Sequence, residues 1–201
     1  MPRIARIVLP NTPHHVTQRG NRRQKTFFNQ SDYKVYLNLL FKWADYFQVN
    51  IDAYCLMPNH VHLILRPSNL TGMTNAMREI HRSYTLTINR RYGWQGCLWQ
   101  GRFFSVPLDE EHFENAIRYV ELNPVRAHIV TDPTKYPWSS AAHRNTSSCF
   151  YDKPLNLNVI RKMTTSGRPE CSDSFAKEIL NKTGVNILRK KVGRPHKLSK
   201  N

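Results

Sequence analysis

The sequence is poor in acidic residues and lacks the patterns that would place it in a membrane or cross-link it. Only 14 Asp and Glu residues stand against 30 Lys and Arg. There is no long apolar run, no signal-peptide core and no Lys-only amphipathic helix, so we expect neither a membrane span nor an export signal. The four cysteines are widely scattered without a Cys-x-x-Cys pair, which disfavours a zinc ribbon or a disulfide framework. A reducing cytoplasm fits this pattern.

The excess of cations predicts a polyanionic partner. The net charge is +16 and the isoelectric point is near 10.1, which favours nucleic acid, with an anionic membrane surface as the competing partner. With 201 residues, of which 40% are hydrophobic, there is room for one globular domain and a tail. We expect a domain at 1–150 and a basic C-terminal extension at 151–201, with one short helix from Asp173 to Asn181 and a flexible end.

The periodicity of apolar residues predicts an α+β domain. Alternating segments predict strands, and apolar residues at helical spacing predict helices, the first with Ser31 as its N-cap and the third with Asp109. The expected strands are 14–19, 49–57, 59–66 and 99–106, and the expected helices are 32–48, 71–92 and the segment that Asp109 caps. This order favours a mostly antiparallel sheet with helices packed on it and a ferredoxin-like, RRM-like core.

A His-x-His pair opens one expected strand, in Met57-Pro58-Asn59-His60-Val61-His62-Leu63-Ile64-Leu65. Alternation along the strand places His60 and His62 on one face and Val61 on the other. Two imidazoles that point the same way from a rigid strand form half of a metal site. Such a pair on its own is more often a couple of ordinary surface or core histidines, so the metal hypothesis depends on other residues.

A tyrosine and an asparagine lie four residues apart on the third expected helix. Tyr119 and Asn123 share one flank of that helix, whereas Glu121 lies off this flank and is expected to face solvent. If the helix lies against the histidine strand, two imidazoles, an amide oxygen and a phenol come together. Such donors can hold a divalent cation and leave positions open for phosphate oxygens. The phenol can then act as a nucleophile when a cation or loss of its proton activates it.

Both residues also have plain structural explanations. Tyr119 can be a half-buried helix tyrosine, and Asn123 can simply end the helix before Pro124. The choice between these explanations and the catalytic hypothesis needs further sequence signals.

Four stretches together carry a resemblance to a known family. They are His15-Val16-Thr17-Gln18-Arg19-Gly20-Asn21, Tyr54-Cys55-Leu56-Met57-Pro58-Asn59-His60-Val61-His62-Leu63, Trp99-Gln100-Gly101-Arg102-Phe103 and Tyr119-Val120-Glu121-Leu122-Asn123-Pro124-Val125-Arg126-Ala127. Over roughly the first 145 residues, the chain resembles the REP-associated tyrosine transposases, a branch of the HUH single-strand transposases. The resemblance implies the HUH endonuclease fold and a bacterial, nucleoid-associated location.

The resemblance also implies the roles of individual residues. It implies that His60, His62 and Asn123 bind Mg²⁺ or Mn²⁺ and that Tyr119 is the nucleophile. The family cleaves single-stranded DNA at hairpins of repetitive extragenic palindromes and leaves a 5′-phosphotyrosine and a free 3′-OH. We expect DNA contacts from the following residues of the strands, loops, helices and basic tail: His15, Arg19, Asn21, Arg22, Arg23, Arg82, Arg102, Arg126, Arg189, Lys190, Arg194 and Lys197. The tail around Gly193-Arg194-Pro195 resembles a minor-groove hook, and a generic charged tail explains it equally well.

Alternatives to a catalytic transposase remain open. One is a hairpin-binding protein or regulator without cleavage activity. Another is an RNA-binding ferredoxin-like domain, which requires base-stacking aromatics on an open sheet face. We expect a monomer, with a dimer that exchanges its tyrosines as the alternative.

Overall fold

A four-stranded antiparallel sheet forms the centre of the protein. The computed structural model describes residues 6–144, 149–166, 169 and 171–187. The strands lie in the order β2-β3-β1-β4 and comprise β1 (His14–Arg19), β2 (Val49–Met57), β3 (His60–Pro67) and β4 (Phe104–Pro107). Helix α1 (Gln30–Tyr46) connects β1 to β2, and α2 (Gly72–Tyr92) connects β3 to β4. This β-α-β-β-α-β order is ferredoxin-like, so the predicted α+β class is confirmed.

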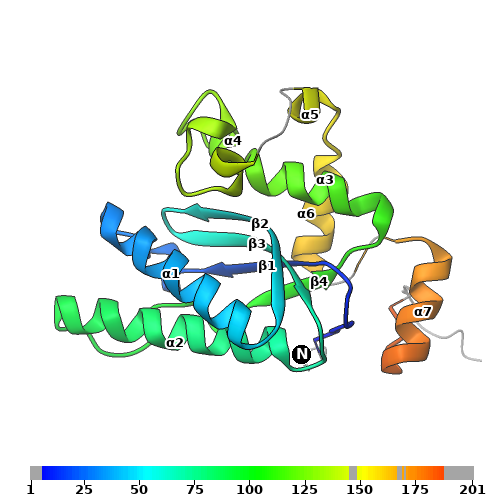
Figure 1. Cartoon of the computed structure of the whole chain (residues 1–201), viewed down its shortest axis with the longest axis horizontal. Coiled ribbons are helices and arrows are strands. Elements are labelled where there is room, and N and C mark those ends of the chain that lie inside the picture. Colours follow the sequence, from blue (N-terminus) through cyan, green and yellow to red (C-terminus); the bar gives the residue numbers. More distant parts are fainter. Residues whose placement is uncertain (1–5, 145–148, 167–168, 170, 188–201) are drawn as a thin grey trace, which may run out of the picture.

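Helices α1 and α2 cover one face of the sheet (Figure 1). The side of β3 that carries Val61, Leu63 and Leu65 packs against them, and all three side chains are buried. The inward residues that the sequence predicted for α2 are fully buried: Met73, Met77, Ile80, Tyr84 and Ile88. The histidines of β3 therefore point to the opposite face, as the strand alternation requires.

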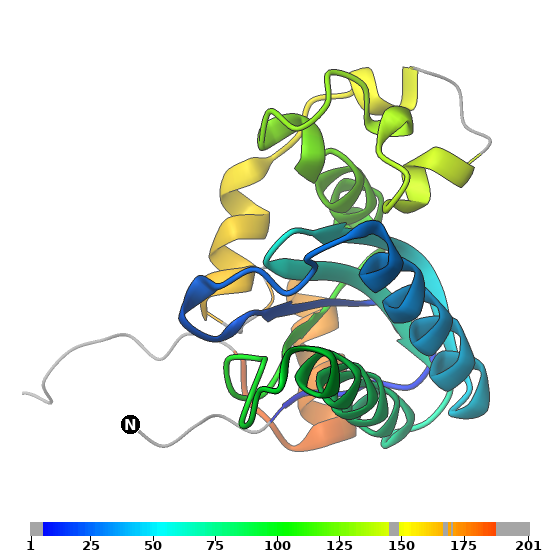
Figure 2. The ribbon, with the colours of Figure 1, turned by 90° about the vertical axis from the view of Figure 1, so that its left-hand side faces the viewer.

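Helices α3 (Glu110–Glu121), α4 (Asn123–Arg126) and α6 (Leu157–Ser166) lie on the histidine side of the sheet (Figures 1 and 2). Ala116, Ile117 and Val120 of α3 form the buried stripe that the sequence predicted. Helices therefore pack on both faces of the sheet.

The remaining elements are short or peripheral. Helix α7 (Asp173–Thr183) confirms the predicted helix of the extension and buries Ile179 against Leu9. The others are α5 (Cys149–Asp152) and 3₁₀ turns at Asn21–Arg23, Pro133–Lys135 and Ser140–His143.

Three predicted element boundaries are wrong for local reasons. The third predicted helix ends at Glu121, and Asn123 begins the separate helix α4, whose first turn accommodates Pro124. Helix α1 is capped by Asn29 instead of Ser31, because the Asn29 side chain accepts the Asp32 N–H and the Asp32 carboxylate accepts the Asn29 N–H. Strand β4 begins at Phe104 instead of residue 99. Trp99 forms only an isolated bridge with Gly20, and Gly101 has a positive φ of 61° that interrupts the extended chain.

Candidate active site

The tight β2–β3 turn sets His60 and His62 at the start of β3. Met57 pairs with His60, so Pro58 and Asn59 alone connect the two strands. His62 is 6% exposed. Both histidines line a pocket of about 340 Å³, together with Arg19 and Arg102. The pocket therefore combines two imidazole groups with two cations, a composition suited to a phosphodiester.

Each histidine uses its Nδ1 atom in a hydrogen-bonded contact. His60 Nδ1 lies 2.6 Å from Asn59 Oδ1, and His62 Nδ1 lies 3.0 Å from His15 Nε2. An amide oxygen only accepts, so the proton of neutral His60 is on Nδ1 and its Nε2 keeps a lone pair. His60 is thereby prepared to act as a ligand through Nε2.

Burial keeps the imidazoles of this site neutral. It lowers the pKa of His60 to about 4, helped by the positive charge of Arg19. Burial also lowers the pKa of His62 well below its ordinary value, with further contributions from His15, His60, Arg126 and Arg19. Neutral imidazoles have the free lone pair that a metal ion requires, so this donor set is available at physiological pH.

Tyr119 reaches the histidines from α3. The residue is 8% exposed, and its ring packs edge-on against His62 and His15, with centroid separations of 5.8 Å in both cases. The phenol thus lies on the same side of the sheet as the His-x-His pair. Tertiary folding places the expected nucleophile beside the expected metal ligands, within a single chain.

Two residues beyond α3 hold the backbone of Tyr119. The Asn123 amide donates to the Tyr119 carbonyl at 3.4 Å, and Arg126 Nη1 donates to the same oxygen at 2.9 Å. The Arg126 guanidinium also lies 4.1 Å from the centre of the Tyr119 ring. Asn123 is 9% exposed, and its amide oxygen, the ligand atom expected from sequence, takes no part in the bond to Tyr119.

The residues expected to contact DNA fall into several groups. Arg19 and Arg102 line the histidine pocket, and Asn21, Arg22 and Arg23 form an exposed turn directly after β1. Arg82 is exposed but lies on α2, across the sheet from the histidines, and pairs with Glu79 at 2.9 Å. Arg189, Lys190, Arg194 and Lys197 lie outside the described residues.

The structure argues against one of these expected DNA contacts. His15 is 1% exposed, and its ring faces His62 and Tyr119. The sequence motif included His15 and Asn59 but did not reveal that they contact the Nδ1 atoms of the two histidines. Gln100, another residue of that motif, lines the pocket. The contact of His15 with His62 depends on the register of β1 against β3, for which no sequence signal was found.

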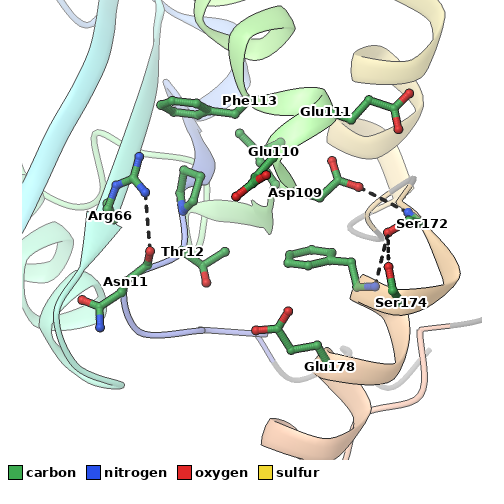
Figure 3. A pocket seen from close by; sticks show the side chains of 13 residues that line it. Asn11, Thr12, Arg66, Asp109, Glu110, Glu111, Phe113, Ser172, Ser174 and Glu178 are labelled. Atoms are coloured by element: carbon green, nitrogen blue, oxygen red, sulfur yellow. Dashed lines mark hydrogen bonds between the residues drawn. The ribbon is translucent and has the colours of Figure 1, made fainter.

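A separate acidic pocket lies at the other end of β3, next to Arg66 (Figure 3). Asp109, Glu111 and His112 are close enough to one another to share a metal ion, the one such group of His, Cys, Asp or Glu residues within the described ranges. Asp109 already accepts the His112 and Ser172 backbone N–H groups and contacts His112 Nδ1. This cluster is explained by capping of α3 and by its link to the segment before α7.

Comparison with known proteins defines the class. Residues 9–123, more than half of the chain, match the family model described as "Transposase IS200 like". The protein is therefore a transposase, a DNA-cleaving enzyme. More specifically, the chain belongs to the IS200-like transposase family.

One solved structure supports the same fold. The chain resembles the structure of a REP-associated tyrosine transposase bound to a REP hairpin, with a TM-score of 0.62 and 22% identity, over 77% of this chain and 90% of that one. It also matches a Deinococcus radiodurans R1 protein described as a transposase, with a TM-score of 0.39 and 17% identity, over 60% of this chain and 96% of that one. No curated protein matches. None of the helices in the described ranges is long and apolar enough to cross a bilayer.

Proposed function

We propose that the protein cleaves and rejoins single-stranded DNA beside REP-type hairpins, with Tyr119 as the nucleophile. The observation that carries this proposal is the edge-on packing of the Tyr119 ring against His62, 5.8 Å between centroids. A buried tyrosine set against a His-x-His strand, in a chain of the IS200-like family, supports covalent DNA cleavage, because a metal ion held by the histidines could activate the attack of the phenol on a phosphodiester. The similar solved transposase is bound to a REP hairpin, which supports the choice of substrate.

The expected cation is Mg²⁺ or Mn²⁺, and three protein donors would leave positions open for the water and phosphate oxygens that these ions prefer. His60 and His62 offer neutral imidazole nitrogens, and Asn123 offers an amide oxygen. When bound, the cation polarises the scissile phosphate and stabilises the charge that develops on it. Arg19 and Arg102 line the same pocket and would pair with the DNA phosphates.

The chain supplies the nucleophile and its orientation. The Tyr119 oxygen forms a bond to phosphorus as the bond from phosphorus to the 3′ oxygen breaks. The phenol loses its proton and the departing 3′ oxygen gains one, which leaves a 5′-phosphotyrosine and a free 3′-OH. Because the phosphodiester energy is kept in the new bond, the reverse attack by a 3′-OH can rejoin DNA.

A labelled hairpin oligonucleotide with a single-stranded flank tests the proposal in the presence of Mn²⁺. We expect a covalent protein–DNA adduct that Tyr119→Phe abolishes and that EDTA prevents. Tyr46→Phe is the matched control, since Tyr46 is 71% exposed on α1, and it should form the adduct normally. An adduct that persists in Tyr119→Phe contradicts the assignment, and tight hairpin binding without any adduct favours the non-catalytic alternative.

We also propose that the protein acts as a monomer with its tyrosine in cis. The support is that Tyr119 and His62 of one chain already contact each other. Light scattering should then give a mass near 23.6 kDa. Mixing Tyr119→Phe with His62→Ala should restore no adduct; restored adduct would instead indicate tyrosines exchanged between two chains.

A further inference from the structure

We infer that His15 is a positioning residue that holds His62 in the tautomer needed for metal binding. This inference rests on the proposed role of His60 and His62 as ligands. Asn59 already orients His60 through its Nδ1 atom at 2.6 Å. His15 occupies the equivalent place beside His62, with its Nε2 atom 3.0 Å from His62 Nδ1.

The geometry is that of a hydrogen bond between two imidazoles. The ring planes of His15 and His62 are only 11° apart, with centroids separated by 5.2 Å. The register explains the approach: Thr17 on β1 lies opposite His62, and His15 lies opposite Ile64. His15 and His62 are therefore diagonal neighbours on the same face of adjacent strands, a separation that long side chains can bridge.

The direction of this bond decides whether His62 can bind a cation through Nε2. A neutral imidazole has one N–H and one lone pair. If His62 Nδ1–H donates to His15 Nε2, the lone pair of His62 is on its Nε2 atom, as in His60. If His15 donates instead, His62 carries its proton on Nε2 and cannot bind metal through that atom. Metal-binding histidines commonly depend on such a partner at the second nitrogen.

The position of His15 also couples the metal site to the nucleophile. Its ring packs edge-on against Tyr119, 5.8 Å between centroids, at an interplanar angle of 75°. The side chain is 1% exposed, so β1, His62 and Tyr119 confine it. One buried residue therefore contacts both the expected ligand and the expected nucleophile.

Mn²⁺ affinity tests the inference without depending on catalysis. Calorimetric titration of the full-length protein with Mn²⁺, without DNA, compares wild type with His15→Leu and His15→Gln. Leu removes the acceptor, and the Gln amide oxygen can still accept from His62 Nδ1–H. We expect His15→Leu to weaken Mn²⁺ binding about 10- to 100-fold and His15→Gln to recover a measurable part of that loss.

His14→Leu is the matched control for general damage to β1. His14 is a fully buried histidine on the same strand, and it contacts the Thr12 carbonyl and the Leu9 N–H. We expect this variant to melt at a lower temperature yet to bind Mn²⁺ as tightly as wild type.

The possible outcomes separate the inference from the proposed function. Equal Mn²⁺ affinities for wild type and His15→Leu overturn the positioning role, as do equal losses in the Leu and Gln variants. If His62→Ala binds Mn²⁺ as tightly as wild type, the metal site itself is misassigned. Nitrogen-15 NMR of the metal-free protein gives a second test: His62 should carry its proton on Nδ1, and a dominant Nε2–H form contradicts the inference.

Discussion

Glu121 shows how strongly tertiary partners alter the environment of a single residue. The sequence predicted a solvent-facing glutamate, but the side chain is fully buried, and this prediction is wrong. Ser140 Oγ, Arg144 Nε and the Tyr151 hydroxyl contact its carboxylate at 2.6, 2.8 and 2.9 Å. Its position two residues after Tyr119 means that this network anchors the end of α3 that carries the expected nucleophile.

Glu121→Ala should strongly destabilise the fold. The substitution leaves the Arg144 guanidinium and two hydroxyl groups without the carboxylate, a loss of about 3–5 kcal/mol in the free energy of unfolding. Urea denaturation measures this change in the free energy of unfolding. Asp45→Ala is the control, since this carboxylate of α1 is exposed and its loss should change stability by less than about 0.5 kcal/mol. Similar effects for both variants would contradict a structural role for the buried network.

Arg126 is expected to matter for the placement of Tyr119. Arg126→Gln removes the charged donor to the Tyr119 carbonyl and the guanidinium over its ring. Because such a bond contributes about 1.5–3 kcal/mol, we expect adduct formation to slow by about 10- to 100-fold. Single-turnover cleavage of the hairpin oligonucleotide measures this rate. The exposed Arg90 of α2 provides the control, and an Arg90→Gln variant as slow as Arg126→Gln would point to a general effect of charge.

At the scale of elements, helix α6 is the largest addition to the predicted fold. The sequence predicted one helix after residue 150, yet a further helix, α6, precedes α7 and packs on the face of the sheet that carries the histidines. Ile160 and Met163 are almost completely buried there, together with Val120 of α3. The helix is short and lies in a polar region of the sequence, so its few apolar residues do not by themselves predict a buried helix. They are buried because α3 provides an apolar surface for them to pack against.

Met163→Ala tests whether α6 is part of the main core. We expect a loss of about 2–5 kcal/mol in the free energy of unfolding, because the substitution leaves a cavity between α6 and the core residues it contacts. Asn158→Ala, at an exposed position of the same helix, should cost less than about 0.5 kcal/mol. Urea denaturation of each variant should show one cooperative transition, from which the loss of stability is obtained. An unchanged stability for Met163→Ala would indicate that α6 is detached in solution.

At the scale of the whole molecule, charge is distributed unevenly over the two ends of the sheet. Arg19 and Arg102 line the histidine pocket, whereas Asp109, Glu110, Glu111 and Glu178 line the pocket at the far end of β3 (Figure 3). The two pockets therefore differ in the sign of the charge that lines them. This polarity favours the approach of DNA at the histidine end.

Buried histidines should make the whole fold sensitive to acid. His14 donates from Nδ1 to the Thr12 carbonyl and accepts the Leu9 N–H at Nε2, so only its neutral form satisfies both bonds. Burial lowers its pKa from 6.5 to about 4. Between these values the unfolded chain binds a proton that the folded protein does not, so the free energy of unfolding falls as pH decreases.

The expected slope for His14 is at most about 1.4 kcal/mol per pH unit. Urea denaturation at pH values from 7.5 to 4.5 measures the slope, and His14→Asn should make it shallower than in wild type. The exposed His128 is the control, and His128→Asn should retain the wild-type slope. An unchanged slope in His14→Asn would show that other groups cause the acid sensitivity.

The sequence by itself determined the order of strands and helices along the chain, the direction of the His-x-His pair and the proximity of Tyr119 to Asn123. These features depend on local periodicity, on the tight Pro58-Asn59 turn and on helical spacing. Local patterns of this kind survive folding because they involve residues only a few positions apart.

Only the tertiary structure decided which groups surround those residues. The contact of His15 with His62 depends on the register of β1 against β3, which helix α1 and strand β2 separate in the chain. The burial of Glu121 depends on partners that are 19 to 30 positions away. Such contacts form when elements pack together, and a linear pattern does not encode which distant side chain will complete a given hydrogen bond.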